Sequence, residues 1–124
     1  MAATFDAILF DLLTALVDSW SLWDDLAGDT ELGRRWRMRY LEMTYATPAY
    51  CPYLSLVAES AVASGLPESK AVEMDERWDK LRPWPEAPGV VSALASRKTV
   101  AVVTNCSEEL GERAAARVST CFDV

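Results

Sequence analysis

Residues 7–18 read AILFDLLTALVD, and this stretch decides the fold. The apolar run before Asp11 carries no charge, which is typical of a β-strand buried on both faces of a sheet. The strand ends at the carboxylate of Asp11, and a short segment typical of a turn follows. Open α/β sheets place their chemistry at the carboxyl ends of parallel strands, where loops and helix N-termini line a crevice. Asp11 is therefore either a turn-forming residue or part of a site, and the stretch alone leaves both interpretations open.

A second apolar run, TVAVVT over residues 99–104, is rich in β-branched residues and predicts a second strand. It ends at Thr104 and Asn105, a hydroxyl and an amide, just before a helix predicted for residues 108–118. These groups, together with free backbone amides at a helix N-terminus, can bind an anion or stabilise developing negative charge. The alternative is a local capping motif, with Ser107 as the helix cap.

Apolar residues at helical spacing and glycine stops predict four helices between the two strands. Their expected ranges are 20–28, 30–47, 52–65 and 70–81. Asp29 or Thr30 caps the second of them. Three prolines between residues 83 and 88 then interrupt the helical pattern, and a further helix is expected over residues 89–95.

This order predicts an α/β protein with a Rossmann-like parallel sheet. Two parallel strands and their crossover helix need about 30 residues, so the helices after the first strand form an insertion. We expect an incomplete α/β core of residues 1–17 and 86–124 and an α-helical cap of residues 18–85. Residues 121–124 are expected to begin a third strand.

The composition excludes several classes of function. The 124 residues are 51% hydrophobic, which suits a packed core, and 12 Lys and Arg against 19 Asp and Glu disfavour nucleic acid or an anionic membrane as a partner. Histidine is absent, which excludes Ser–His and Cys–His pairs and histidine metal sites within this chain. Cys51, Cys106 and Cys121 are far apart, as expected for reduced thiols in a cytoplasmic protein. No apolar run approaches the roughly 20 residues that cross a bilayer.

Three features, in order, resemble the haloacid dehalogenase superfamily, and most closely its 2-haloacid dehalogenases. The superfamily's first motif is an apolar strand that ends in a nucleophilic Asp, as the first strand here ends at Asp11. Its second motif is a strand that ends in Thr or Ser, as the second strand here ends at Thr104. The third feature is WRMRYLEMT over residues 36–44, which is similar to a Trp-Arg-x-x-x-Leu-Glu-x-Thr pattern in the dehalogenase cap.

The resemblance implies a hydrolase that acts on a small anionic substrate, a 2-halo acid. Asp11 would be the catalytic nucleophile and form an ester intermediate, which splits one difficult displacement into two easier steps. The backbone amide of Leu12 would point at the bound anion. Thr104 would donate a hydrogen bond to the substrate, and Asn105 would help to hold the leaving halide.

Arg37 corresponds to a cap arginine that reaches the substrate in this family. Its planar fork of donors suits a carboxylate and a departing halide. The alternative is a solvated position on a helix that also carries Arg34, Arg35 and Arg39.

Two departures from the superfamily pattern bear on the chemistry. Phosphatases of the superfamily carry a second Asp two residues after the nucleophile, as general acid and base. This chain has Leu13 there, which cannot transfer a proton and so favours dehalogenation, in which the halide leaves unprotonated and no cofactor is needed. Mg²⁺ is expected only if the protein is a phosphatase. Thr14 and Ala15 stand where the superfamily has Gly-Thr, so the turn must form without glycine.

The superfamily's third and fourth motifs, a Lys and an acidic group, find no counterpart in these residues. We therefore expect the N-terminal part of a larger enzyme, inactive alone. The first strand would have an unpaired apolar edge, which the remainder of the chain or a homodimer partner would cover. A phosphatase or phosphotransferase of the same fold and a noncatalytic relative are the alternatives that the sequence leaves open.

Overall fold

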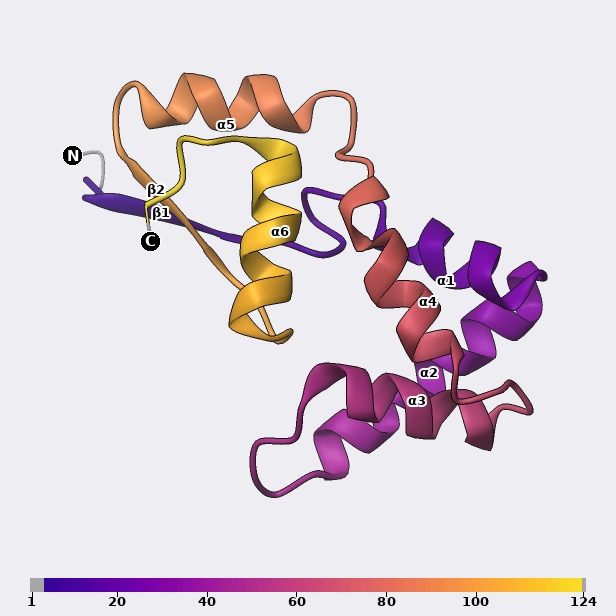
Figure 1. Ribbon diagram of the computed structural model, residues 1–124. Helices are drawn as coiled ribbons and strands as arrows, with labels where there is room; N and C mark the ends of the chain where they lie inside the picture. Colours follow the sequence, from indigo (N-terminus) through magenta and orange to yellow (C-terminus); the bar gives the residue numbers. More distant parts are fainter. Residues whose placement is uncertain (1–3, 124) are drawn as a thin grey trace. The chain divides into compact units, whose positions relative to one another are not determined.

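A computed structural model describes residues 4–123 of the chain (Figure 1). Its elements are β1 (Ala7–Asp11), α1 (Ser19–Ala27), α2 (Thr30–Ala46), α3 (Tyr53–Ala63), α4 (Lys70–Arg77), the 3-10 helix η1 (Trp78–Lys80), α5 (Ala87–Ala95), β2 (Thr99–Val103) and α6 (Glu108–Val118). They form two compact units. The helical unit is Ser19–Lys80, and the sheet unit comprises the chain before and after it.

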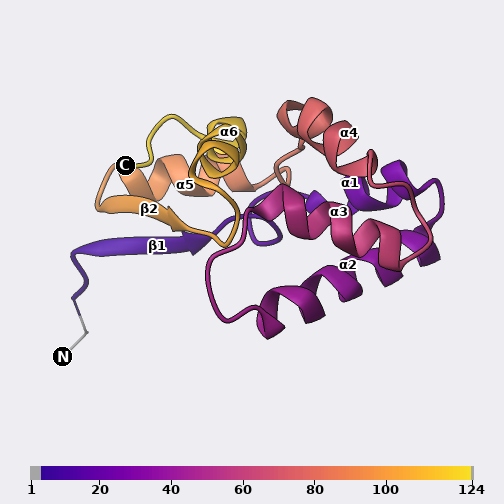
Figure 2. The ribbon, with the colours of Figure 1, turned by 60° about the horizontal axis from the view of Figure 1, so that its bottom comes forward.

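In the sheet unit, β1 and β2 form a two-stranded parallel sheet (Figure 1). The register pairs Ile8 with Val100 and Phe10 with Val102. Helices α5 and α6 lie over one face of this sheet (Figure 2), and Val100 is buried. The observed fold is thus a partial Rossmann-like α/β core, as the sequence predicts.

The prediction that β1 is buried on both faces is wrong. Leu9 is 64% exposed, whereas Ile8 and Phe10 are partly covered. Successive side chains of a strand point to opposite faces, and the helices of the described chain cover only one face. Among residues 4–123, β1 pairs with β2 alone, so the structure gives its other edge no strand partner.

The predicted third strand does not form over residues 121–123, and Val124 lies outside the described residues. The Asp123 amide nevertheless donates a hydrogen bond of 2.9 Å to the Val100 carbonyl oxygen in β2. The Phe122 ring packs edge-on against Phe10, with ring centroids 6.4 Å apart. One backbone bond is too few for a ladder, so this segment is extended chain that contacts the sheet.

In the helical unit, α2 packs against α1 and α3, and α4 packs against α1 and α3 (Figure 2). A continuous series of five aromatic rings fills the interior: Trp23, Trp36, Tyr40, Tyr53 and Trp78. The indole Nε1 of Trp36 donates hydrogen bonds of 3.1 Å to the Val57 carbonyl oxygen and to Ser60 Oγ. The buried polar edge of this large ring is therefore satisfied.

Helix ends follow the predicted signals. The Asp29 carboxylate accepts a hydrogen bond of 2.8 Å from the Leu32 amide, so Asp29 rather than Thr30 is the cap of α2. Gly28 and Gly65 have φ values of +75° and +86°, the left-handed conformation that ends a helix at little cost for glycine. No helix within residues 4–123 combines the length and apolarity that spanning a membrane requires.

The chain leaves the sheet unit and returns to it through two paired segments. Val17 and Pro83 form an antiparallel bridge, and the Asp18 amide donates to the Arg82 carbonyl oxygen at 2.8 Å. The Trp84 amide donates to the Leu16 carbonyl oxygen at 2.9 Å. The segment that follows β1 is thus fixed by the segment that precedes α5.

Candidate functional site

The carboxyl ends of β1 and β2 bring together four of the five predicted site residues. Asp11 is the last residue of β1 and pairs with Val103, the last residue of β2. Leu12 follows Asp11 directly, and Thr104 and Asn105 follow Val103. Asp11 and Asn105 are exposed, and Thr104 is half-buried. A carboxylate, a hydroxyl and an amide therefore share one edge of the sheet, where chemistry is expected in parallel sheets.

The turn after Asp11 forms without glycine. The Leu12 carbonyl oxygen accepts hydrogen bonds from the amides of Leu16, at 3.0 Å, and Val17, at 3.2 Å. Among residues 4–123, positive φ values occur only at glycines, so Thr14 and Ala15 have ordinary backbone conformations. The Leu12 side chain is completely buried, which anchors the residue that follows the candidate nucleophile.

The end of β2 leads directly into a capped helix. Ser107 Oγ accepts a hydrogen bond of 3.2 Å from the Leu110 amide, as the sequence predicts for a cap of α6. A Cβ atom on Gly111 would lie 3.2 Å from Thr104 Cγ2, so α6 packs closely against the end of the strand. This contact limits the space in which the Thr104 side chain can turn.

The thiol of Cys106 lies beside the Thr104 hydroxyl. Oγ1 of Thr104 and Sγ of Cys106 are 3.6 Å apart, a hydrogen-bonding distance for sulfur. Burial raises the pKa of the Cys106 thiol, and the hydrogen bond with Thr104 offsets only part of this effect. The thiol is therefore protonated at neutral pH and is a poor nucleophile.

Arg37, the fifth predicted site residue, belongs to the helical unit and is only 9% exposed. Its Nη1 donates to Asp24 Oδ1 at 2.5 Å and to the Trp20 carbonyl oxygen at 3.4 Å. Its guanidinium carbon lies 4.6 Å from the centre of the Trp20 ring, a cation–π distance. The solvated alternative is therefore wrong for Arg37, although it holds for the exposed Arg34, Arg35 and Arg39.

Sequence reasoning missed the partners of Arg37. Asp24 and Trp20 both lie on α1, and neither belongs to a motif that the sequence singled out. Gly33 on α2 lies directly against Asp24. The available signal was a glycine one helical turn before Arg37, because glycine inside a helix usually marks a close approach of backbones.

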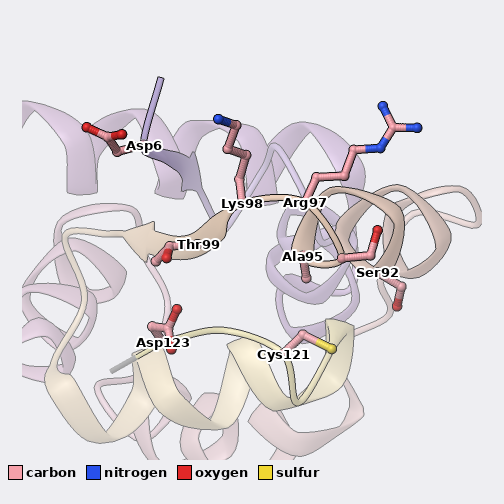
Figure 3. Close-up of a pocket in the computed structure, with 9 residues that line it drawn as sticks. Asp6, Ser92, Ala95, Arg97, Lys98, Thr99, Cys121 and Asp123 are labelled. Atoms are coloured by element: carbon pink, nitrogen blue, oxygen red, sulfur yellow. The ribbon is translucent and has the colours of Figure 1, made fainter. Parts of the chain in front are cut away.

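Asp11 does not line either of two hollows that the described part of the sheet unit contains. One, of about 800 Å³, lies at the opposite edge of the sheet, around Thr99, Cys121 and Asp123 (Figure 3). In Figure 3 the Arg97 guanidinium extends away from the Asp123 carboxylate. The other, of about 760 Å³, lies beside α6 and includes Thr104.

No group of three or more metal-ligating side chains gathers among residues 4–123. The expectation that no cofactor is needed stays a prediction.

The described chain is an α/β protein whose parallel strands have polar carboxyl ends and whose helical unit is inserted after the first strand. This arrangement matches the haloacid dehalogenase fold. No family model matches the chain, and no curated protein matches it in sequence. Among solved structures, the chain is similar in fold to L-2-haloacid dehalogenases.

The enzyme from Xanthobacter autotrophicus, solved with chloropropionic acid covalently bound, has a TM-score of 0.81 at 20% identity, over 97% of this chain and 55% of that chain. A defluorinating L-2-haloacid dehalogenase has a TM-score of 0.78 at 19% identity, over 98% of this chain and 59% of that chain. Another L-2-haloacid dehalogenase has a TM-score of 0.76 at 26% identity, over 97% of this chain and 60% of that chain. The resemblance expected from the sequence is thereby confirmed for the fold, and the chain spans 55 to 60% of the length of these structures.

Proposed function

We propose that this chain is the nucleophile-bearing part of a hydrolase that removes halide from a small 2-halo acid. The observation that carries the proposal is the position of Asp11, exposed at the carboxyl end of β1 and beside the end of β2. A similar enzyme of the same fold has been solved with chloropropionic acid covalently bound. A covalent route through Asp11 accounts for both observations.

In the first step, a carboxylate oxygen of Asp11 attacks C2 of the halo acid. The carbon–oxygen bond forms as the carbon–halogen bond breaks, and the halide leaves with the bonding electron pair. In the second step, water attacks the ester carbonyl, which releases a 2-hydroxy acid and a proton and restores the Asp11 carboxylate. Halide leaves without protonation, so the apolar Leu13 does not hinder the first step.

The groups beside Asp11 suit an anionic substrate. The hydroxyl of Thr104 and the amide of Asn105 lie at the adjacent strand end and can donate to a carboxylate or to the leaving halide. The amide of Leu12 is a third donor in this proposal. Arg37 supplies the positive charge, from a helical unit that acts as the cap.

Mass spectrometry tests this mechanism on the protein expressed from its complete reading frame. After incubation with 2-chloropropionate and rapid denaturation, the peptide containing Asp11 should gain one propionate unit. The Asp6→Asn variant, which changes an exposed acid just before the opposite end of β1, should retain this adduct. The Asp11→Asn variant should lose it together with halide release.

Halide release that is undiminished in Asp11→Asn would overturn the proposal. Magnesium-dependent turnover of an aryl phosphate, without halide release, would establish the phosphatase alternative. A folded protein that turns over neither substrate class would establish the noncatalytic alternative.

A further inference from the structure

Arg37 is held far more firmly than the arginines around it. Arg34, Arg35 and Arg39 are exposed, whereas the Arg37 side chain is only 10% exposed. One edge of its guanidinium is bound to the Asp24 carboxylate, and one face is covered by the Trp20 ring. A buried arginine must be paired, and this pair satisfies that requirement inside the helical unit.

The pair depends on a close approach of α1 and α2. A Cβ atom on Gly33 would lie 2.7 Å from the Asp24 Cα atom, closer than real Cβ contacts allow. Only glycine fits there, and it lets the backbone of α1 lie directly against α2. Gly33 precedes Arg37 by four residues, one helical turn, so both lie on the same face of α2. Asp24 therefore packs against the face of α2 that carries both Gly33 and Arg37.

The pairing leaves part of the guanidinium unused. Every hydrogen bond that the structure gives Arg37 within residues 4–123 is made by Nη1. An arginine carries five N–H donors in a rigid fork, so Nε and Nη2 keep donors for another acceptor. Because one edge and one face of the guanidinium are fixed, its remaining donors need little further ordering to bind an anion.

We propose that Asp24 is a positioning residue, which orients Arg37 so that its remaining donors bind the anionic 2-halo acid, at its carboxylate or at the departing halide. This inference rests on the proposed function, in which Arg37 contacts the substrate. Asp24 itself touches no reacting atom. Trp20 and Gly33 complete the arrangement, one by covering the guanidinium face and the other by allowing the helices to approach.

Asp24 could also have the opposite effect on substrate binding, and the sign of the change in KM distinguishes the two effects. A carboxylate beside Arg37 neutralises its charge, so a purely electrostatic role would weaken the attraction for an anionic substrate. Removal of Asp24 would then improve substrate binding. Removal of a positioning residue has the reverse result, because the freed guanidinium must be ordered when the substrate binds.

The experiment measures kcat and KM for 2-chloropropionate in the protein from its complete reading frame. We expect Asp24→Ala to raise KM about tenfold, and Asp24→Asn, which keeps an oxygen acceptor in the same place, about threefold. Asp25→Asn is the matched control, because Asp25 is the exposed neighbouring acid on α1 and pairs with Arg77 instead; its KM should stay within about twofold. Thermal unfolding shows which variants fold. If Asp24→Ala does not fold, the KM of Asp24→Asn tests the inference.

A double-mutant cycle separates positioning from general damage. If Asp24 acts through Arg37, Asp24→Asn raises KM in the wild-type background and has no further effect beside Arg37→Ala. An unchanged or lowered KM in Asp24→Asn would overturn the inference while the ester on Asp11 still supports the proposed function. An unchanged KM in Arg37→Ala would remove Arg37 from the substrate site and overturn the inference as well. Absence of the Asp11 ester and of halide release in the wild type would instead defeat the proposed function itself.

Discussion

The indole Nε1 of Trp84 donates a hydrogen bond of 2.8 Å to the carbonyl oxygen of Thr14, 70 residues earlier in the chain. Thr14 lies in the turn that follows the candidate nucleophile, and Trp84 lies in the segment that precedes α5. Together with the Val17–Pro83 bridge, this bond fixes a turn that lacks the expected glycine.

Trp84→Phe should therefore lower the free energy of unfolding by about 1 kcal/mol, because it keeps an aromatic ring but removes the indole donor. Urea denaturation measures this change. Tyr45→Phe, at a residue that is 82% exposed, is the control and should change stability by less than about 0.5 kcal/mol. Equal stability of Trp84→Phe and the wild type would show that the bond does not fix the turn.

Gly33→Ala should destabilise the helical unit by about 2 kcal/mol or more, because the added methyl group meets the backbone of Asp24. Gly89→Ala provides a matched control within α5, where a Cβ atom meets nothing within 4 Å. That change should stabilise the protein by up to about 1 kcal/mol through helix propensity. Thermal unfolding of both variants measures the difference, and a harmless Gly33→Ala would contradict the close approach of α1 and α2.

Trp36→Phe should cost about 2 kcal/mol, because it leaves a void in the aromatic interior and removes the donor that bonds Val57 and Ser60. Ser60→Ala removes one of the two acceptors and leaves the other, so its cost should be smaller. Urea denaturation of both variants gives the order. A larger loss in Ser60→Ala would mean that the hydroxyl, rather than the ring, stabilises this interior.

The stability of the sheet unit should fall in alkaline solution. Burial raises the pKa of the Cys106 thiol above its ordinary value of 9.0, so the folded state holds this proton more tightly than the unfolded state. Below the unfolded pKa both states are protonated and stability is full. As pH rises through 9.0, the unfolded state loses its proton first, and stability declines until pH passes the folded pKa.

Urea denaturation at about pH 8 and about pH 10 tests this dependence. Cys106→Ser, whose hydroxyl does not titrate in this range, should lose less stability than the wild type between the two values. Equal losses in both proteins would assign the alkaline effect to other groups.

Local signals in the sequence predicted the secondary structure well, because helix caps, helix stops and strands depend mainly on neighbouring residues. Asp29 and Ser107 are caps, Gly28 and Gly65 are helix stops, and the two apolar runs are parallel strands, as their residue types require. The placement of Asp11 beside the end of β2 follows from the rule that parallel strands end at the same edge.

The expectations that failed concern contacts distant in sequence. The apolar character of Leu9 predicted burial, but burial depends on which elements cover each face of the sheet. The Arg37 pattern on α2 did not identify Asp24 as the partner, because the pair arises from the packing of two helices, of which Gly33 was the one local signal. A residue's type limits its surroundings, and only the tertiary arrangement determines them.

The paired segments at Val17 and Pro83 have a topological consequence. The two ends of the insertion are hydrogen-bonded to each other, so the insertion is a closed loop. Its ends form a short antiparallel stem that belongs to the sheet unit. The entropy of closing a loop rises only slowly with its length. An insertion of this kind can therefore grow, shrink or be exchanged over evolution while the stem keeps the strand ends, and Asp11 with them, in register.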